Sequence, residues 1–376
     1  MDNVHLHIVS FQVPDPPDYG GVIDVFYKVK ALAAAGVHVH LHTYQYGRKQ
    51  SELLASVCHS VHYYPRTAMW KAFFSKRPMI VQSRDEVALR QNLMLDAYPV
   101  LYEGLHTTAS MAQMHAAGKY CIVRMHNNEP QYYADLSKRE PNFFRRLYFV
   151  EESRRLTQYE QVLQHADVIC CISPAETTYY KQQWDNVLHV PAFHGSATVT
   201  SATGKGSFIL YHGNLEVNEN VEAALFILQQ VCPFISASVV IAGANPDARI
   251  LEAAKNMQHV RIVANPDHAQ LQNLIREAHM HFLPAFQETG IKLKLLNALF
   301  NGRFCMVTRQ MVEGTGLEPY CLITHTADDA IHAIKSYMDV PFTHEDVVFR
   351  KSIEQLYNDD ASAEAIIQLL RLVPVL

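Results

Sequence analysis

The chain has 376 residues, of which 49% are hydrophobic and 18% are charged, and its formal net charge is −5. This is the composition of a globular protein with room for two domains. It argues against a membrane-spanning protein, because no run approaches the ~20 apolar residues of a transmembrane helix. The acidic balance also gives no sign of nucleic-acid binding.

The first third of the chain alternates strand and helix patterns. Val4–Phe11 is rich in β-forming residues, and the turn-forming segment PDPPDYGG follows it. Val22–Ala35 then has helical spacing, and Val37–Thr43 is the next predicted strand. Such a unit predicts parallel strands joined by a right-handed crossover. Further strands are expected at Ser60–Tyr64, Val100–Leu105, Tyr120–Met125 and Asp167–Ile172, and helices at Asp85–Leu95, Thr107–Ala117 and Asn142–His165.

His38, His40 and His42 fall on one face of the second strand, a geometry that could hold a metal ion. No cysteine or carboxylate cluster accompanies them in the sequence. A row of half-buried polar residues is the commoner explanation, so no metal site is predicted here. The seven cysteines lie in apolar runs without a CxxC pair. They predict buried free thiols in a reducing compartment.

Residues 191–207, PAFHGSATVTSATGKGS, lack periodicity and are rich in small and polar residues, which predicts a linker. A second alternation follows, beginning with the strand FILYHGNL and the helix ENVEAALFILQQV. Residues 344–376 are expected to form a helical tail. The predicted organisation is an N-terminal domain at 1–190, the linker, a C-terminal domain at 208–343, and the tail.

The two alternations predict an α/β protein made of two Rossmann-like, doubly wound domains. No G-x-G-x-x-G occurs in the chain, so the dinucleotide-binding fingerprint is absent. Two such domains facing one another are expected to leave a cleft at the carboxyl ends of their strands, where ligands usually bind.

The stretch 286–308, FQETGIKLKLLNALFNGRFCMVT, predicts a glycine-bearing loop, a helix, an Asn-Gly stop and a buried strand. At ~100° per residue, Leu293, Leu296 and Phe300 share one side of the helix. Lys294, Asn297 and Asn301 share another side. This polar side faces either water or a phosphate-bearing ligand, and the helix alone favours neither.

Within this stretch, GIKLKLLNALFNGRFCMV resembles the pattern G-x-R-x-K-x-L-E-A-M-A-x-G-x-P-V-V. That pattern marks the donor site of GT-B glycosyltransferases, in particular the retaining family 4 enzymes and their bacterial relatives. The resemblance extends over nearly the whole chain. It implies the GT-B fold and transfer of a sugar from a nucleotide-diphosphate sugar to a hydroxyl of a glycan or lipid-linked acceptor, with retention of configuration.

On this resemblance Lys292 takes the place of the pattern's Arg, and Lys294 takes the place of its Lys. Gly302 matches its glycine. The two lysines would neutralise the leaving diphosphate, so the implied reaction needs neither a cofactor nor a metal ion. Two helical residues two positions apart point about 200° from one another. Both lysines therefore reach the diphosphate only if the helix begins at or after Lys292.

The chain departs from the family in two places. Asn297 replaces a glutamate that contacts ribose hydroxyls, and an amide can hold a hydroxyl but lacks the charge that strengthens the bond. The E-x7-E spacing is not met, because Thr289 stands where the upstream acid is expected and Glu288 precedes it. The loop YHGNLEVNEN also lacks the Arg and Lys of many relatives. The implied donor-binding residues are Gly213, Asn214, Glu288, Thr289, Gly290 and Asn297.

Two N-terminal segments complete the resemblance. PDPPDYGGVIDVFYK resembles the first loop of the family, where the N–H groups of Gly20 and Gly21 could meet a polar or anionic ligand. RMHNNEPQYY resembles the R-x-H-N-x-E segment at the end of a cleft strand. It implies that His126 orients the sugar as part of the catalytic set, with Arg124, Asn127 and Glu129 on the acceptor side.

The implied partners are a nucleotide-sugar donor and a glycan or lipid-linked acceptor. TAMWKAFFSKRP and NFFRRLYF combine aromatic and basic residues, which suits a membrane interface and equally a core helix with solvated ends. The protein is expected in the cytoplasm, at the inner face of the membrane. Two alternatives stay open: an epimerase of UDP-sugars with the same fold, and a non-catalytic glycosyltransferase-like binding protein.

Overall fold

The computed structural model describes residues 4–18, 20–67, 75–286 and 293–372. The chain divides into two compact units. Unit 1 contains Met1–Phe193 and Asp359–Leu376, and unit 2 contains His194–Asn358. The boundary falls within the segment predicted as a linker.

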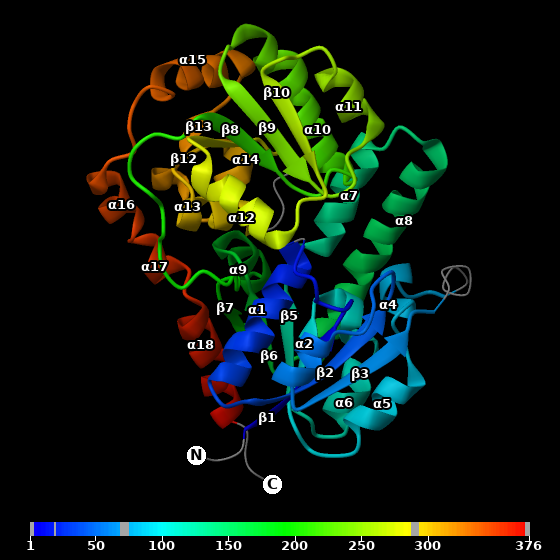
Figure 1. Ribbon diagram of the computed structural model, residues 1–376. Helices are drawn as coiled ribbons and strands as arrows, with labels where there is room; N and C mark the ends of the chain where they lie inside the picture. Colours follow the sequence, from blue (N-terminus) through cyan, green and yellow to red (C-terminus); the bar gives the residue numbers. More distant parts are fainter. Residues whose placement is uncertain (1–3, 19, 68–74, 287–292, 373–376) are drawn as a thin grey trace. The chain divides into compact units, whose positions relative to one another are not determined.

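Unit 1 is built on a seven-stranded sheet whose strand order is β3-β2-β1-β4-β5-β6-β7 (Figure 1). Every neighbouring pair is parallel. The strands are β1 His5–Ser10, β2 His38–Gln45, β3 Ser60–Pro65, β4 Val100–Glu103, β5 Cys121–Met125, β6 Val168–Cys171 and β7 Val187–His189. The chain order reverses between β1 and β4, which makes this pair the topological switch point of the sheet.

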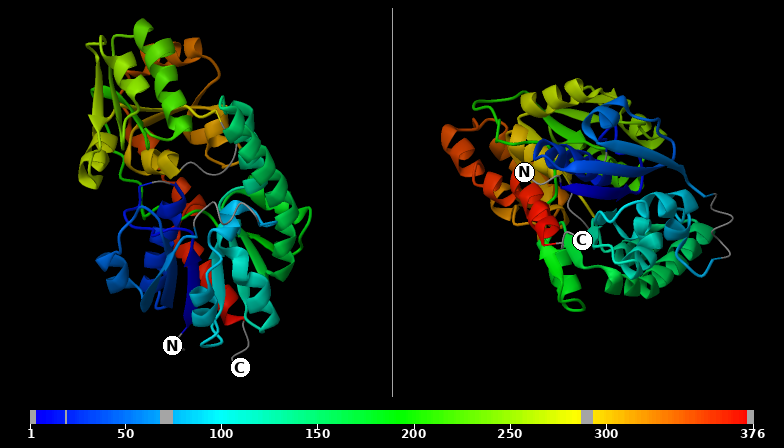
Figure 2. Two further views of the ribbon diagram at one scale, coloured as in Figure 1. Left: turned by 90° about the vertical axis from the view of Figure 1, so that its right-hand side faces the viewer. Right: turned by 90° about the horizontal axis from the view of Figure 1, so that it is seen from below.

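Helices cover both faces of this sheet because each face carries its own apolar cluster. The helices of unit 1 are α1 Gly20–Ala34, α2 Glu52–Val57, α4 Met79–Gln82, α5 Val87–Leu93, α6 Met111–Ala116, α7 Glu129–Arg139, α8 Phe143–Tyr159, α9 Pro174–Lys181 and α18 Asp359–Arg371, with 3-10 turns η1 Leu105–Ser110 and η2 Glu160–His165. In Figure 2, α7 and α8 run side by side as a long hairpin.

Unit 2 repeats this design with a six-stranded parallel sheet of order β10-β9-β8-β11-β12-β13. Its strands are β8 Phe208–His212, β9 Ser238–Gly243, β10 Val260–Ala264, β11 Met280–Leu283, β12 Phe304–Thr308 and β13 Leu322–Thr324. Its helices are α10 Asn218–Phe226, α11 Ala248–Ala254, α12 His268–Glu277, α13 Leu293–Asn301, α14 Arg309–Val312, α15 Ala327–Tyr337, α16 His344–Arg350 and α17 Ile353–Leu356, with short turns η3 Ile227–Val231, η4 Cys232–Phe234 and η5 Glu318–Tyr320. The predicted α/β class with two doubly wound sheets is confirmed.

The predicted tail 344–376 is mainly helical in its described residues, 344–372, but its helices belong to two different units. Helices α16 and α17 belong to unit 2, whereas α18 belongs to unit 1 and packs against α1. Ile366 and Leu370 of α18 are buried in the same apolar cluster as Leu6 of β1 and Val25 of α1. The apolar stripe of α18 is therefore part of the core of unit 1.

The seven cysteines are free, and all except Cys321 are buried. This confirms the prediction of buried thiols. Burial raises the pKa of these thiols, for example to about 12 for Cys58. A thiol held in this protonated form is a poor nucleophile, so packing is the role that the structure gives it.

Gly302, which follows α13, is required by close packing. A Cβ atom built on it would lie 2.0 Å from Nε2 of His281 and 2.8 Å from the carbonyl oxygen of Ala298. The His281 ring is fully buried and its Nε2 bonds the carbonyl oxygen of Ile275 at 3.1 Å, so it cannot move aside cheaply. This explains in physical terms why a glycine stands at this place in this chain.

We expect Gly302→Ala to lower the free energy of unfolding by about 1–3 kcal/mol, the usual cost of overpacking a dense core. Gly20→Ala is the matched control, because a Cβ atom there meets no heavy atom within 4 Å. Chemical denaturation of both variants measures the difference. Equal stability of the two variants would contradict the tight contact between Gly302 and His281.

Candidate active site

Buried charged side chains gather near the switch point of unit 1. Asp24 and Lys28 lie one turn apart on α1, Glu103 ends β4, Arg124 lies on β5 and His126 follows that strand. The side chains of the first four are 0–1% exposed, whereas that of His126 is 10% exposed. His126 is therefore the member of this group that can touch a ligand.

Ion pairs and hydrogen bonds connect the group. Nζ of Lys28 lies 3.0 Å from Oδ2 of Asp24 and 2.6 Å from Oε1 of Glu103. Arg124 donates from Nη2 to Oδ1 of Asp24 at 2.8 Å and from Nε to Oδ2 at 3.2 Å. Nε2 of His126 lies 2.8 Å from Oε2 of Glu103. Two cations thus balance two carboxylates, and Glu103 fixes the orientation of the His126 ring.

The charges of this group depend on one another. Burial alone would raise the pKa of Asp24, but the charges of Arg124 and Lys28 outweigh it and hold that pKa well below its ordinary value. Burial likewise opposes ionisation of Glu103, and the charge of Lys28 together with the bond from His126 lowers its pKa. Both carboxyl groups are therefore ionised at neutral pH, and the ionised Glu103 accepts the N–H at Nε2 of His126.

Asp24, Glu103 and His126 each offer a ligand atom within 4.8 Å of the others, which is close enough to hold a metal ion. The ammonium group of Lys28 already lies between the two carboxylates, at 3.0 Å from Asp24 and 2.6 Å from Glu103. A divalent cation would have to displace it and leave a buried positive charge without its partners. The group fits the ammonium better than a metal ion.

The predicted glycines of the first loop lie near His126. The ring of Phe11, which follows β1, meets the His126 ring edge to face at 5.8 Å between centroids. A Cβ atom on Gly21 would lie 2.7 Å from Cζ of the same phenylalanine. Gly20 and Gly21 begin α1 and are half-buried. The structure therefore brings the predicted loop and His126 together around Phe11.

Arg124 has a different role from the one that the resemblance implied. Its side chain is fully buried, and besides Asp24 it bonds the carbonyl oxygens of Val190 at 2.7 Å and Pro191 at 2.9 Å. A guanidinium enclosed in this way cannot reach an acceptor. Arg124 is a positioning residue that ties β5 to α1 and to the end of the N-terminal segment.

Asn127 and Glu129 follow His126 at the start of α7. Asn127 is half-buried, whereas Glu129 is buried and lies near His106, with 3.8 Å between its Oε2 and Nε2 of that histidine. Burial raises the pKa of Glu129 to about 8; the charge of Arg84 lowers this pKa and the charge of Glu176 raises it. At neutral pH Glu129 is therefore a protonated acid that can donate a hydrogen bond.

We expect Glu129→Gln to change how stability depends on pH. The folded-state pKa of about 8 lies above the ordinary value of 4.5, so the folded state binds more protons than the unfolded state between these values. Stability then falls as the pH rises from 4.5 towards 8. Glutamine cannot ionise, so the free energy of unfolding of the variant, measured relative to that of wild type, should rise by up to about 4 kcal/mol between pH 4.5 and pH 9.

Denaturation of wild type and variant at several pH values measures this gain. Glu52→Gln is the control, because Glu52 is an exposed side chain of the same unit. A pH-independent difference between wild type and Glu129→Gln would show that Glu129 is ionised in the folded protein.

In unit 2 the side chain of Lys294 points at the start of α10. Its Nζ donates to Oδ1 of Asn220 at 2.8 Å and lies 5.0 Å from the centre of the Tyr211 ring. Nδ2 of Asn220 in turn donates to the carbonyl oxygen of Asn214 at 2.9 Å. The structure therefore brings together Lys294 and the predicted loop of Gly213 and Asn214, at the carboxyl end of β8.

Asn297, which is half-buried, and Asn301, which is buried, bond one another within unit 2. Nδ2 of Asn301 donates to Oδ1 of Asn297 at 2.9 Å, and Oδ1 of Asn301 accepts a bond from Thr200 at 2.8 Å. One lone pair of the Asn297 oxygen is thus engaged within the unit, and its role as a ribose contact stays a prediction. The described residues do not include four predicted site residues, Glu288, Thr289, Gly290 and Lys292. The prediction that the helix begins at or after Lys292 is therefore not tested.

His212 is a residue near this site that the sequence patterns did not single out. It ends β8, directly before Gly213, and burial holds its pKa well below the ordinary value, with the charges of His281 and Lys294 acting in the same direction. Within the described part of the chain neither ring nitrogen has a hydrogen-bond partner. Such a buried, unsatisfied ring is costly in a folded protein, and it lies directly before the loop of Gly213 and Asn214.

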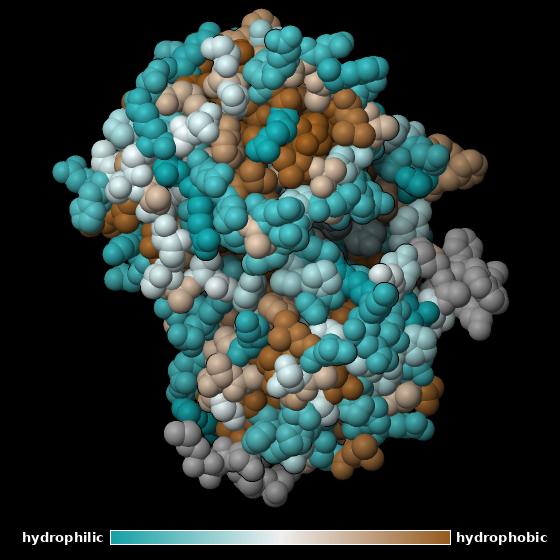
Figure 3. All heavy atoms as spheres, viewed as in Figure 1, coloured by the Kyte–Doolittle hydropathy of each residue, from teal (hydrophilic) through white to brown (hydrophobic). Residues whose placement is uncertain are grey.

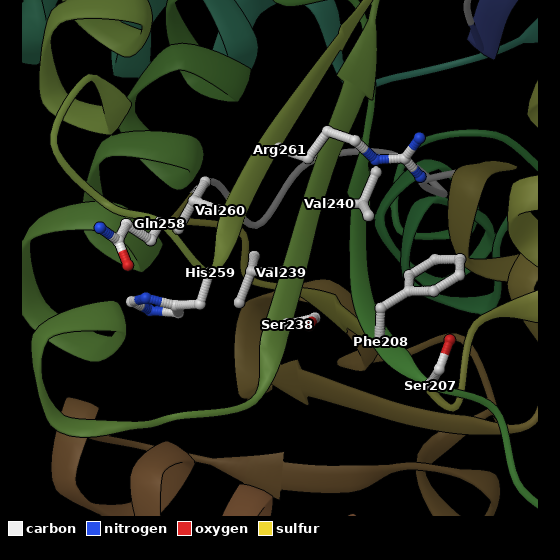
Figure 4. A pocket seen from close by; sticks show the side chains of 9 residues that line it. All are labelled: Ser207, Phe208, Ser238, Val239, Val240, Gln258, His259, Val260 and Arg261. Carbon is white, nitrogen blue, oxygen red and sulfur yellow. The ribbon is translucent and has the colours of Figure 1, made fainter.

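The pocket shown in Figure 4 does not coincide with the site around Lys294. It is a hollow of about 290 Å³ at the amino ends of β8, β9 and β10. Its lining residues are Ser207, Phe208, Ser238, Val239, Val240, Gln258, His259, Val260 and Arg261. Lys294 and the Gly213 loop lie at the opposite edge of the sheet, where doubly wound sheets bind their ligands.

Part of the chain is similar to a known family. Residues 206–339, which form most of unit 2, match the family described as glycosyl transferases group 1. A protein of Klebsiella pneumoniae, named an uncharacterized 44.6 kDa protein in the cps region, is 24% identical over 329 residues, covering 82% of this chain and 84% of that protein. The resemblance predicted from the sequence is confirmed.

Solved structures show the same fold. A glycosyltransferase from Rickettsia africae superposes with a TM-score of 0.67 at 10% identity, over 99% of both chains. WaaG, a glycosyltransferase involved in lipopolysaccharide biosynthesis, gives 0.67 at 11% identity, over 97% of this chain and 99% of that one. OtsA gives 0.62 at 10% identity, over 99% of this chain and all of that chain.

Proposed function

We infer the details of the reaction of this chain, which is a glycosyltransferase of group 1, from the chemistry of its two sites. The proposed reaction moves a sugar from a nucleotide-diphosphate donor to a hydroxyl group of a glycan or lipid-linked acceptor. Unit 2 would bind the donor, and unit 1 would supply His126 and the acceptor contacts. The proposed transfer retains the anomeric configuration and requires no metal ion or cofactor.

The position of Lys294 carries this proposal. When the bond to the sugar breaks, negative charge grows on the leaving diphosphate, and a fixed cation stabilises that charge. Lys294 places its ammonium group at the first turn of α10, where Asn220 accepts its bond. The helix offers a second source of stabilisation, because Val217 at its N-cap provides no side-chain hydrogen bond to the first N–H groups.

His126 is proposed to orient a sugar hydroxyl. Glu103 accepts from Nε2, and Nδ1, which lies 3.9 Å from Oδ2 of the buried Asp24, is the ring nitrogen left for a substrate hydroxyl. A hydroxyl donor from the substrate could bind there, next to the Phe11 ring. This role positions the substrate and does not demand that His126 remove a proton.

Product analysis with a panel of UDP- and GDP-sugars and a glycan acceptor tests the proposal. Transfer of labelled sugar to the acceptor with an unchanged anomeric configuration supports it. An epimerised donor without transfer would show the UDP-sugar epimerase, and tight donor binding without any turnover would show the non-catalytic binding protein.

The free tip of the α7–α8 hairpin is proposed to contact a membrane that carries the acceptor. Phe144 is 80% exposed, and Phe143, Leu147 and Val150 on the same helix are 51–56% exposed. Figure 3 shows hydrophobic surface at this tip. Arg146 lies over the ring of Phe143 at 5.8 Å, so an apolar surface and a cation occur together. In the described part of the chain no helix is long and apolar enough to cross a membrane.

We expect Phe143→Ser/Phe144→Ser to reduce sedimentation with anionic liposomes several-fold, because it removes two interfacial aromatic rings. Val348→Ser/Phe349→Ser in α16 is the control, since both of its side chains are 55% exposed. Equal sedimentation of the two double variants would argue against this contact and against the proposed location at the inner face of the cytoplasmic membrane.

A further inference from the structure

Four imidazole rings meet at the amino end of the unit 1 sheet. His5 begins β1, His38 and His40 lie on β2, and His59 directly precedes β3. The ring centroids of His5 lie 4.7 Å from His38, 5.3 Å from His40 and 5.6 Å from His59. The His59 centroid lies 5.1 Å from His38 and 4.9 Å from His40. This group is distinct from the candidate active site, which lies at the carboxyl ends of the strands.

The parallel register brings these rings together. His5 pairs with His38 across β1 and β2, and His40 pairs with Ser60 across β2 and β3. Alternate residues of a strand face the same side of a sheet, so His38 and His40 share a face with His5. His59 is exposed and the other three rings are half-buried. An ion from solvent can therefore reach the group.

We propose that His5, His38, His40 and His59 form a binding site for a divalent transition-metal ion that favours imidazole ligands, such as Zn²⁺. In a tetrahedral site with Zn–N bonds of about 2.0–2.1 Å, two ligand nitrogens lie roughly 3.3 Å apart and two imidazole centroids roughly 5 Å apart. The centroid distances of 4.7–5.6 Å within the group enclose that value. Nitrogen ligands from histidine suit zinc, copper and nickel.

One pair of ligand atoms is almost in place. Nδ1 of His5 and Nε2 of His40 lie 2.9 Å apart and share one proton. A metal ion can take the place of that proton if the two nitrogens separate by a few tenths of an ångström. The other nitrogen of His40, Nδ1, bonds Oγ of Ser60 at 2.9 Å. A partner of this kind on the second ring nitrogen is typical of histidines that bind metals, because it fixes the ring.

The remaining two ligands require the rings to turn. His5 and His38 are stacked with 21° between their planes, and the Tyr98 ring stacks on His5 at 4.2 Å. In these orientations no three of the four histidines, all of which the structure describes, bring ligand nitrogens within 4.8 Å of one another. His59 stands nearly perpendicular to His38, with 85° between the planes, and is exposed, so it is free to rotate about its side-chain bonds. Binding is therefore expected to change the χ angles of His38 and His59 while the backbone of the sheet stays in place.

Zn²⁺ titration of the full-length chain without an affinity tag tests this site, after treatment with a chelator and removal of the chelator. Calorimetry should show one ion per chain with a dissociation constant in the micromolar range or below. His40→Gln and His59→Gln should each weaken binding at least tenfold, and Ser60→Ala should weaken it by about 10-fold or more through the His40 ring. Circular dichroism and thermal unfolding establish that each variant is folded.

His115→Gln/His165→Gln is the matched control, because these two rings also lie 5.7 Å apart on unit 1. It should leave the stoichiometric binding unchanged. Co²⁺ bound in place of Zn²⁺ should give the visible absorption of a four-coordinate site, and His59→Gln should reduce it. The proposal is overturned if no ion binds stoichiometrically, if folded His59→Gln binds as wild type does, or if the control variant loses the ion. Its outcome does not depend on the proposed sugar transfer.

Discussion

Replacement of Lys294 by alanine is expected to lower the turnover number by two to three orders of magnitude and to leave the protein folded. Removing one fixed group that stabilises a developing negative charge typically costs about 10²–10³-fold in turnover. Lys294 is half-buried and directs its ammonium group to Asn220 at the first turn of α10. The loss should appear in the turnover number more than in the donor KM, because the charge on the diphosphate grows in the transition state.

Two variants separate this effect from loss of fold. Lys294→Arg keeps a cation and should retain part of the activity, although its larger, planar group presents its donors in a different geometry. Lys255→Ala removes a lysine of the same unit whose side chain is 66% exposed and should leave turnover unchanged. Near-normal turnover of Lys294→Ala would refute the assignment of Lys294 to the leaving diphosphate.

The strands of both sheets are the part of the fold that the sequence predicts best. Val100–Leu105 was expected as a strand and is β4 at Val100–Glu103, and Phe304–Thr308 is β12 with every residue buried. Strands of a parallel sheet are covered on both faces, so they appear in the sequence as short, continuous apolar runs. Such runs need no knowledge of their neighbours to be recognised.

Helices with mixed composition were missed for an equally clear reason. Neither α7 nor α9 has a long apolar stripe, and only their start signals could have revealed them. Asn128 caps α7 and accepts a bond from Gln131, and Ser173 caps α9 and accepts one from Glu176. In each case a proline follows within two residues of the cap, which is a common start of a helix.

The side-chain clusters lie beyond what a linear pattern can show. Glu103 and His126 meet because β4 and β5 are neighbours, and Lys28 joins them from a helix 75 residues before Glu103. The group of four histidines could not be found from spacing alone either. The spacing of His38 and His40 predicts only a polar face, and the pairing of β2 with β1 and β3 brings His5 and His59 beside them. Register between strands, rather than spacing along one strand, creates both sites.

The polar side of α13 shows, within a single helix, what spacing predicts and what only tertiary contacts decide. Lys294, Asn297 and Asn301 share a side as their spacing predicts, and the open question was whether that side faces water or a ligand. In the structure Lys294 bonds Asn220, and Asn301 bonds both Asn297 and Thr200. Two of these three residues thus bond one another within unit 2, and only Lys294 points at the start of α10, next to the loop after β8.

Lys28→Met is expected to lower the free energy of unfolding by about 3–5 kcal/mol, the usual cost of removing one partner of a buried ion pair. The side chain of Lys28 is fully buried between Asp24 and Glu103, so its loss leaves the two carboxylates with Arg124 as the remaining buried cation of the cluster. A protein is typically stable by about 5–15 kcal/mol, so this single change removes a large part of the total.

Lys28→Met/Glu103→Gln tests whether charge balance is the reason. It removes one charge of each sign, so chemical denaturation should show that it regains much of the stability that Lys28→Met loses. Glutamine in place of Glu103 no longer offers His126 a charged acceptor, so the stable double variant should still turn over substrate slowly. Recovery of stability without recovery of activity would separate the two roles of the cluster: Lys28 compensates buried charge, and Glu103 orients His126. If the double variant were no more stable than Lys28→Met, charge balance would not be the reason, and the hydrogen bond that Nζ of Lys28 donates to Asp24 would be what the cluster requires.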